Sequence, residues 1–346
     1  MPTSPSPAPP GPPVAVTMGE PAGIGGEVLL AAWRRRRAGD PVFFALDDPG
    51  RLRRVAALAG IGAGVAVIDD PSEAGAAVGS ALPVLPLSRE VPFPLGRLDP
   101  ASAPAALESI ERAVSLTRQG RAAAVVTNPV HKANLYAAGF AFPGHTEYLA
   151  HLAGVRRVVM MLASPELRVV PVTVHVPLRQ VPELLTGELI EETALVVEEA
   201  LRRDFGIARP RLAVAGLNPH AGEGGTLGEE DGRVIAPAVA RLRERGLDVR
   251  GPLPADTMFH AEARRGYDAA LCMYHDQALI PLKALDFDRG VNVTLGLPFV
   301  RTSPDHGTAL DIAGRGVARP DSLVAAIATA AELSGRRAAA EGRCEA

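Results

Sequence analysis

The chain has 346 residues, a formal net charge of −3 and 47% hydrophobic residues. This length is enough for two domains, or for one large domain with a deep cleft. The nearly balanced charge gives no sign of a nucleic-acid partner, and no apolar run approaches the ~20 residues that would cross a membrane. Cys272 and Cys344 are the two cysteines, too few for a disulfide framework, and their scarcity favours a reducing cytoplasm.

Residues 1–13 contain seven prolines and no positive charge, which predicts a disordered arm and is unlike a signal peptide. Apolar runs and amphipathic segments then alternate along the chain. Strands are predicted over 14–17, 42–46, 122–127, 169–174, 212–217 and 269–274, and helices over 27–37, 51–59, about 99–120, 189–203, 231–245 and 321–333. This alternation predicts an α/β fold with a largely parallel sheet. Residues 60–100 are rich in Gly, Pro and Ala and stay unassigned, and the tail after Ser334 is expected to fray.

A glycine-rich turn, Gly19-Glu-Pro-Ala-Gly-Ile-Gly-Gly-Glu27, lies between the first predicted strand and the first predicted helix. Its glycines allow positive φ and a close approach of the backbone, and the helix N-terminus would receive an anion. A tight structural turn is the equal alternative. Neither this turn nor any other stretch matches Gly-x-Gly-x-x-Gly, so the ordinary Rossmann fingerprint is absent.

Three histidines, His175, His220 and His275, each follow one of the predicted strands. Ligand-binding groups gather at the carboxyl ends of strands in an open α/β sheet. Three neutral imidazoles with an open fourth position form a catalytic metal site of the zinc type. Taken alone, each histidine is better explained by a local hydrogen bond at a strand end. The setting that all three share predicts one divalent metal, which zinc, cobalt, magnesium or manganese would satisfy.

Two carboxylates accompany these histidines. Asp276 directly follows His275, and Asp256 lies in Ala255-Asp-Thr-Met-Phe-His260. Carboxylates beside metal-binding histidines orient the imidazoles or bound water. Both are therefore candidate catalytic residues.

Two further motifs carry side chains or turns suited to a polar ligand. His145 and Thr146 follow a glycine and are predicted to bind a small polar substrate, with a fourth metal ligand or a helix cap as alternatives for His145. Gly222 and Gly224 lie in the turn after His220, where glycines would let a nucleotide or phosphate approach the backbone.

Only two of the 36 basic residues are lysines, Lys132 and Lys283. Lysine is a compact cation that can also release its proton, so a chain that otherwise uses arginine keeps lysine where these properties matter. Chance retention is the alternative. Lys283, Asn292 and Arg301 follow one another at intervals of nine residues, and two cations with an amide suit a phosphate or carboxylate substrate.

The most specific stretch is Ser303-Pro-Asp-His-Gly-Thr-Ala-Leu-Asp-Ile-Ala-Gly-Arg-Gly316. It resembles the loop that binds the adenine side of the cofactor in the isocitrate/isopropylmalate dehydrogenase superfamily, with its similar His-Gly-Ser/Thr-Ala-x-Asp-Ile-Ala-Gly. The resemblance implies that NAD or NADP binds without a Rossmann fingerprint. The expected cofactor contacts in this loop are Asp305, His306, Gly307 and Asp311. The turn that follows His220 would add Gly222 and Gly224. Because Lys283 is remote from this loop in sequence, we expect it not to affect cofactor affinity.

Six motifs together resemble the 4-hydroxythreonine-4-phosphate dehydrogenase family, in the family's order and from about residue 15 to 330. They are Gly-Glu-Pro-Ala-Gly-Ile-Gly, Pro-Gly-His-Thr-Glu, Val-His-Val-Pro-Leu-Arg, Leu-Asn-Pro-His-Ala-Gly-Glu, Met-Tyr-His-Asp-Gln and Arg-Thr-Ser-Pro-Asp-His-Gly-Thr-Ala-Leu-Asp-Ile-Ala. One departure is Gly26, where the family usually has proline. The resemblance implies a divalent metal held by His175, His220 and His275, and substrate contacts from His145, Thr146, Lys283, Asn292 and Arg301.

The resemblance also implies a fold of the isocitrate/isopropylmalate dehydrogenase type, with two α/β domains around a central cleft. The first domain is expected to comprise 14–136 with 300–335, including the cofactor loop, and the second 137–299, with the metal and substrate residues. A homodimer whose sites are completed by the partner chain is implied as well.

In that family NAD takes a hydride from C3 of 4-phosphohydroxy-L-threonine, and the β-keto acid loses CO₂. The product is 3-amino-2-oxopropyl phosphate, a precursor of pyridoxal phosphate. A metal held by three histidines suits this reaction because it lowers the pKa of the hydroxyl and polarises the ketone. Metal-bound hydroxide, Asp256 and Lys283 are the candidate proton acceptors.

Three alternatives remain at this point. The nearest is a related dehydrogenase of 4-phosphothreonate or 4-phosphoerythronate. A histidine-bound zinc hydrolase without a nucleotide is disfavoured by residues 305–314. A binding protein without catalysis is disfavoured by the number of polar groups beyond the three histidines.

Overall fold

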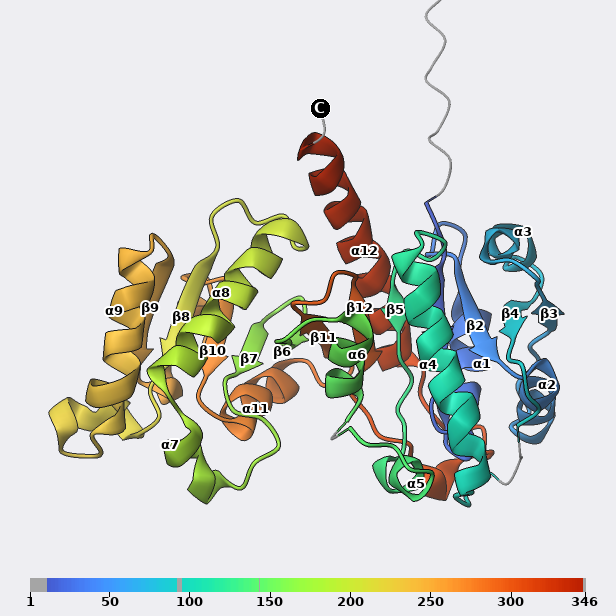
Figure 1. Cartoon of the computed structure of the whole chain (residues 1–346), viewed down its shortest axis with the longest axis horizontal. Coiled ribbons are helices and arrows are strands. Elements are labelled where there is room, and N and C mark those ends of the chain that lie inside the picture. The colour runs from blue at the N-terminus through green and yellow to red at the C-terminus, as the bar shows by residue number, and fades with distance from the viewer. Residues whose placement is uncertain (1–10, 92–94, 143, 345–346) are drawn as a thin grey trace, which may run out of the picture.

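The computed structural model describes residues 11–91, 95–142 and 144–344. A 12-stranded sheet with the order β3-β4-β2-β1-β5-β12-β11-β6-β7-β10-β8-β9 forms its centre, and helices pack along the sheet (Figure 1). The strands are β1 Val14–Thr17, β2 Phe43–Asp47, β3 Val65–Val67, β4 Leu82–Pro86, β5 Val125–Val126, β6 Val159–Ala163, β7 Arg168–Pro171, β8 Arg211–Ala215, β9 Asp248–Leu253, β10 Ala269–Cys272, β11 Val291–Leu295 and β12 Arg301–Pro304.

The helices alternate with these strands along most of the chain. They are α1 Gly25–Arg35, α2 Pro49–Leu58, α3 Ala74–Ala77, α4 Ala103–Arg118, α5 Lys132–Ala137, α6 His145–Ala153, α7 Val181–Leu184, α8 Gly187–Arg203, α9 Ala236–Glu244, α10 Ala261–Arg264, α11 His275–Leu285 and α12 Asp321–Cys344. The α/β fold predicted from this alternation is confirmed.

The sheet consists of two parallel groups of strands. One runs from β3 to β12 and the other from β7 to β9, and all the pairings within each group are parallel. The pairs β12–β11, β11–β6 and β6–β7 between the groups are antiparallel. Figure 1 shows the first parallel group on the right and the second on the left, with the antiparallel strands β11 and β6 between them. The central strands join both halves of the molecule into one sheet.

Strands in the parallel groups are covered on both faces, which explains why they appear in the sequence as continuous apolar runs. Every residue of β1, β2 and β10 is buried. The three strands that precede the predicted metal ligands end earlier than expected, at Pro171, Ala215 and Cys272. His175 and His220 therefore lie in loops, and His275 is the first residue of α11.

The C-terminal helix is longer than the sequence predicted. α12 continues past Leu333 to Cys344, so the expectation of a frayed tail after Ser334 is wrong for the described residues. The cause is a tertiary contact. Arg337 is buried and donates through Nε and Nη2 to the Asp204 carboxylate at 2.8 and 2.7 Å. The start of the chain is also held, because Pro13 is buried and its carbonyl accepts from Ala123 N at 2.9 Å. Residues 1–10 of the expected arm lie outside the described residues.

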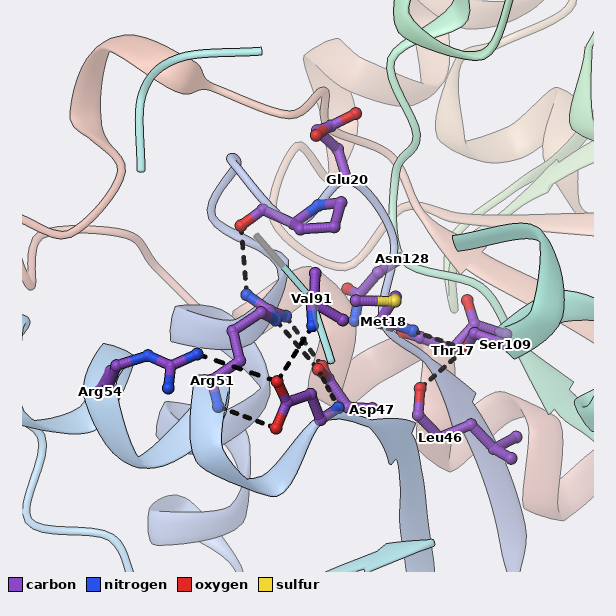
Figure 2. A network of polar contacts seen from close by, with 12 residues as sticks. Thr17, Met18, Glu20, Leu46, Asp47, Arg51, Arg54, Val91, Ser109 and Asn128 are labelled. Carbon is purple, nitrogen blue, oxygen red and sulfur yellow. Dashed lines mark hydrogen bonds and ion pairs between the residues drawn. The ribbon is translucent and has the colours of Figure 1, made fainter. Parts of the chain in front are cut away.

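Buried polar contacts hold the glycine-rich turn in place (Figure 2). Arg51 is completely buried, donates to both oxygens of Asp47 at 3.0 and 2.8 Å, and reaches the Pro21 carbonyl at 3.2 Å. A β-carbon at Gly26 would lie 3.1 Å from both terminal nitrogens of Arg51. Glycine at position 26 therefore leaves room for the buried Arg51–Asp47 ion pair.

Candidate active site

Two of the predicted metal ligands lie side by side. β7 and β10 are neighbouring parallel strands, so the residues that follow them meet at one edge of the sheet. The rings of His175 and His275 have centroids 5.7 Å apart. They line a cavity of about 220 Å³ together with Thr173, Leu178, Tyr274 and Asp276, among others. With Zn–N bonds of ~2.0–2.1 Å, two imidazoles on one ion have centroids roughly 5–5.5 Å apart, close to the spacing found here.

The third histidine follows β8, which pairs with β10 on its other side. His220 opens a left-handed turn in which His220, Ala221 and Glu223 have φ of 53°, 53° and 43°. Its Nδ1 lies 2.8 Å from a Glu223 carboxylate oxygen. Among the described residues of one chain, no three His, Cys, Asp or Glu side chains are grouped so as to hold a metal ion. A single subunit thus brings two of the three predicted ligands together.

Backbone strain is concentrated in the predicted functional loops. The non-glycine residues with positive φ in the described part of the chain are His175, His220, Ala221, Glu223 and Ala309. Such residues are uncommon, and the left-handed conformation costs roughly 1–2 kcal/mol at each of them. Strain of this kind persists where function requires a particular geometry. All five lie in the loops of two candidate metal ligands or in the predicted cofactor loop.

The histidine pair has the chemistry that a metal requires. Burial lowers the pKa of His175, and the charges of Lys132 and His275 lower it further, so His175 is neutral at neutral pH. Asp276 Oδ1 lies 2.7 Å from His275 Nδ1, which holds the ring and leaves Nε2 available. A carboxylate on the far nitrogen is the usual support of a metal-bound imidazole. The donor set therefore fits a divalent ion.

A buried cation lies on the central strand β12, and a neutral histidine begins helix α6. Arg301 of β12 is 3% exposed and donates to Thr294 Oγ1 at 2.8 Å and, through Nε, to Thr127 Oγ1 at 3.1 Å. Burial lowers the pKa of Arg301 to about 10, so it remains charged at neutral pH. Burial, with the charges of Arg301 and Lys132, lowers the pKa of His145 to about 3. The Nε2 atom of His145 is buried and has no hydrogen-bond partner in the described structure.

The other predicted substrate residues adjoin this pair. Asn292 of β11 is opposite Ser303 and alternates with the buried Val291 and Val293, so it shares a face of the sheet with Thr294. Because Thr294 binds Arg301, Asn292 and Arg301 project to the same side. Thr146 follows His145 in the first turn of α6.

Lys283 contacts the predicted cofactor loop. Its Nζ lies 2.9 Å from Asp305 Oδ2 and 5.8 Å from the centroid of the Phe287 ring. The expectation that Lys283 does not affect cofactor affinity was based on sequence separation, but α11 carries Lys283 to the end of β12 in space. The candidate substrate cation and the candidate cofactor loop share an ion pair.

The cofactor loop packs against the glycine-rich turn. Ile24 N donates to the Thr308 carbonyl at 3.0 Å, and a β-carbon at Gly23 would lie only 2.6 Å from that oxygen. Buried Glu27 accepts from Gly314 N at 2.9 Å and from Ala318 N at 3.3 Å. The sequence did not identify Glu27 as an anchor of this loop.

The residues predicted to touch the cofactor differ in their surroundings. Gly307 and Gly224 have open space where a side chain would begin, whereas a β-carbon at Gly222 would lie 2.9 Å from the Gly228 carbonyl. Asp311 is exposed, and His306 Nε2 is buried without a hydrogen-bond partner in the described structure. Gly307, Gly224 and Asp311 are therefore open to a ligand, and the close packing explains glycine at position 222.

Two charged residues near the histidines complete the site. Asp256 is exposed in the short turn Ala255–Thr257, which packs against the turn of His220. Lys132 is the first residue of α5, and its charge acts on both His145 and His175. Sequence reasoning singled out Lys132 as a rare lysine and gave it no role. The rarity of lysine in this chain was the feature of the sequence that could have identified Lys132 as a functional residue.

Comparison with known proteins identifies the family. The model of the pyridoxal phosphate biosynthetic protein PdxA matches residues 40–330. The chain belongs to the PdxA family. It is 57% identical over 334 residues to the 4-hydroxythreonine-4-phosphate dehydrogenase of Methylorubrum populi, covering 94% of this chain and 95% of that protein. The resemblance inferred from the six motifs is confirmed.

Solved structures agree with this PdxA assignment. The crystal structure of 4-hydroxythreonine-4-phosphate dehydrogenase from Klebsiella pneumoniae has a TM-score of 0.85 and 41% identity, covering 94% of this chain and 98% of that one. A terephthalate 1,2-cis-dihydrodiol dehydrogenase from Burkholderia xenovorans has a TM-score of 0.61 and 28% identity, covering 91% and 97%. The fold thus also occurs in a dehydrogenase named for a different substrate.

Proposed function

We propose that this PdxA family member uses NAD to oxidise 4-phosphohydroxy-L-threonine at C3, and that decarboxylation then gives 3-amino-2-oxopropyl phosphate for pyridoxal phosphate biosynthesis in the cytoplasm. The observation that carries the proposal is the 57% identity, over nearly the whole chain, to a relative named 4-hydroxythreonine-4-phosphate dehydrogenase. The geometry supports it, since a pair of histidines lies near a buried cation and a neutral histidine.

His175, His220 and His275 would hold a divalent ion. The bound ion would supply Lewis acidity to the hydroxyl and then to the ketone, while NAD would accept the hydride. Asp276 orients the ring of His275 through its contact with Nδ1. Asp256 lies in a turn that packs against the turn of His220. We propose that its carboxylate contacts this part of the metal site.

The substrate would be bound by groups that are already fixed. Arg301 is held by two threonines, so it loses little freedom when an anion binds. His145 stays neutral and offers Nε2 as a hydrogen-bonding atom, with Thr146 and Asn292 as further polar contacts. Lys283 would bind a substrate anion either in place of Asp305 or together with it, since its ammonium is paired with the Asp305 carboxylate.

NAD would bind between the cofactor loop and the glycine-rich turn. Asp305, His306, Gly307 and Asp311 are the proposed contacts in the loop, with Gly224 and Gly222 from the turn after His220. The close packing of Gly23 on Thr308 supports the view that the two segments form one surface. Glu27 would fix that surface through its two backbone contacts.

We further propose that the working protein is a homodimer whose metal site draws on both subunits. Within the described part of one chain, only two of the three histidines are close together. Large apolar side chains are exposed beside His175 and along α11, which begins at His275: Leu178 and Ile280 are each 65% exposed, and Phe287 just after α11 is 73% exposed. A second copy of the chain would cover this surface and bring a further histidine to the site.

The decisive experiment is to follow NADH formation by the purified protein with each divalent metal and a set of 4-phosphorylated hydroxy acids. We expect turnover of 4-phosphohydroxy-L-threonine, with release of CO₂, to exceed that of 4-phosphothreonate and 4-phosphoerythronate. Faster turnover of either hydroxy acid would assign the chain to a different substrate. No NADH formation with any metal would overturn the proposal.

A further inference from the structure

The proposed substrate carries both a phosphate and a carboxylate, so its binding calls for more than one cation. Lys283 is already paired with Asp305 at 2.9 Å. Arg301 is 3% exposed, and its guanidinium donates to Thr127 and Thr294. These two cations therefore have existing partners, with which a substrate anion would compete.

Lys132 differs from both of them. It is exposed, and within the described ranges no hydrogen bond or ion pair engages its ammonium. The side chain runs alongside the residue that precedes His145, because a β-carbon at Gly144 would lie 3.5 Å from both Lys132 Cε and Nζ. Lys132 thus places a cation that has no direct ion-pair partner among the described residues next to the first turn of α6, where His145 and Thr146 lie.

The surroundings explain why this charge is available. Glu147 Oε2 lies 3.1 Å from the same β-carbon position of Gly144, and no ion pair joins Glu147 to Lys132. After burial, the charge of Lys132 contributes to the lowered pKa of His145 and of His175. Lys132 therefore lies within electrostatic range of both His145 and His175.

We propose that Lys132 binds an anionic group of the substrate, its phosphate or its carboxylate, next to His145 and Thr146. The inference rests on the proposed function and adds a binding residue to it. Lysine suits this role because its compact, three-donor ammonium accepts an oxyanion from several directions. It also gives a physical reason for one of the two lysines in an arginine-rich chain.

The test compares wild type with Lys132→Gln and Lys132→Arg, using Arg209→Gln as a matched control. Arg209 is exposed, precedes β8 at its amino-terminal end, and loses the same charge far from the histidines. KM and kcat are measured with 4-phosphohydroxy-L-threonine and with unphosphorylated 4-hydroxythreonine. Calorimetry measures the binding of inorganic phosphate and of acetate to the same metal-loaded proteins.

We expect Lys132→Gln to raise KM for the phosphorylated substrate about tenfold or more, with a smaller change in kcat, and Lys132→Arg to recover part of the loss. If Lys132 binds the phosphate, the effect disappears with 4-hydroxythreonine and phosphate binding weakens. If it binds the carboxylate, the effect persists with both substrates. Unchanged KM in an active Lys132→Gln enzyme would overturn the inference. If the wild type turns over neither substrate, the proposed function fails, and calorimetry in which Lys132→Gln binds both inorganic phosphate and acetate as the wild type does would then overturn the role of Lys132 as well.

Discussion

At the scale of single residues, the exposed side chains around the histidine pair and the buried ones on the central strands have different tasks. The side chain of His220 is 64% exposed and that of His275 is 37% exposed, so neither contributes much packing. Arg301 and His145 are enclosed, and their positions depend on the sheet. Substitution of the exposed histidines should therefore separate catalysis from stability.

We expect His275→Ala to lower kcat at least a hundredfold while the protein stays folded. Loss of one of three imidazoles should cripple metal affinity, and little burial is lost. Metal content, turnover and circular dichroism are the measurements. His260→Ala is the matched control, because His260 is exposed and only caps α10, accepting from Ala263 N at 3.4 Å. Near-native turnover of metal-depleted His275→Ala would refute the metal assignment.

Lys283→Arg should lower kcat/KM by tenfold or more, about 1.4 kcal/mol of transition-state stabilisation. A planar guanidinium does not replace a compact ammonium at a packed position. Because Lys283 is paired with Asp305, we also expect NAD affinity to shift, in both Lys283→Arg and Asp305→Asn. Cofactor titration by fluorescence measures this shift. Unchanged NAD affinity in both variants would show that the ion pair does not couple substrate to cofactor.

At the scale of elements, the cofactor loop is held from two sides. Glu27 of α1 binds its backbone at Gly314 and Ala318, and Ser322 of α12 receives a bond from Asp305 N at 3.0 Å. Neighbouring helices thus fix a loop that has little regular structure of its own. The charged residues of this loop then influence whether the enzyme prefers NAD or NADP.

We expect the enzyme to prefer NAD over NADP. A 2′-phosphate requires a basic clamp, and Asp305 and Asp311 make the loop acidic. Arg319 is engaged by Asp288 at 2.9 Å and by Asp321 at 3.2 Å, which leaves Arg315 as the nearby cation in the loop. Comparison of kcat/KM for the two cofactors is the test, with Arg315→Gln expected to reduce any remaining use of NADP. Equal efficiency with both cofactors would contradict this prediction.

The junction between α8 and α12 is a second element whose stability depends on a single carboxylate. Burial raises the pKa of Asp204, but hydrogen bonds from Arg337 and Arg203 outweigh this and hold it below its usual range. We expect Arg337→Met to cost about 3–5 kcal/mol, since it removes a partner of a buried charge, and Arg203→Gln to cost less than about 1 kcal/mol, since Arg203 is partly exposed. Urea denaturation of both variants measures the difference.

The same carboxylate predicts a pH dependence. A depressed pKa in the folded state contributes stability that is fully present above the unfolded pKa of about 4. This stability is lost as the pH falls through the lower folded value. Arg337→Met should therefore lose less stability than wild type on acidification below about pH 4. Parallel losses in both proteins would show that Asp204 is not the group responsible.

At the scale of the whole molecule, the continuous sheet joins two halves, and the exposed apolar side chains of Leu178, Ile280 and Phe287 lie beside His175 and along or just after α11. No helix in the described ranges has both the length and the apolar character to cross a membrane. The cluster of exposed apolar residues is the surface we propose for pairing of subunits.

Ile280→Asp should therefore give a folded monomer with little activity, because Ile280 is 65% exposed on α11 and burying a charge at an apolar interface is costly. Light scattering gives the mass and NADH formation the activity. Leu58→Asp is the control, since Leu58 is 62% exposed at the end of α2 in the other half of the molecule. A dimeric, active Ile280→Asp protein would place the interface elsewhere.

Sequence alone determined the features that have a local physical cause. The parallel strands are apolar throughout because both faces are buried, and each predicted strand is present. The candidate metal ligands His175, His220 and His275 were identified because each of them follows a predicted strand. The cofactor loop was identified because it has its own sequence motif. Residues 60–100 resisted prediction because β3, β4 and α3 are short, with prolines in β4 and only alanine and glycine in α3.

Tertiary structure decided what depends on distant partners. β11 and β12 were not predicted because polar residues such as Asn292 and Arg301 interrupt them, and only the sheet gives those residues neighbours. The tertiary structure also decided three features that the sequence did not predict. They are the pairing of Lys283 with Asp305, the extension of α12 by Arg337, and the position of Lys132 next to His145. Each depends on segments that are far apart in sequence, and no local pattern encodes which segments will meet.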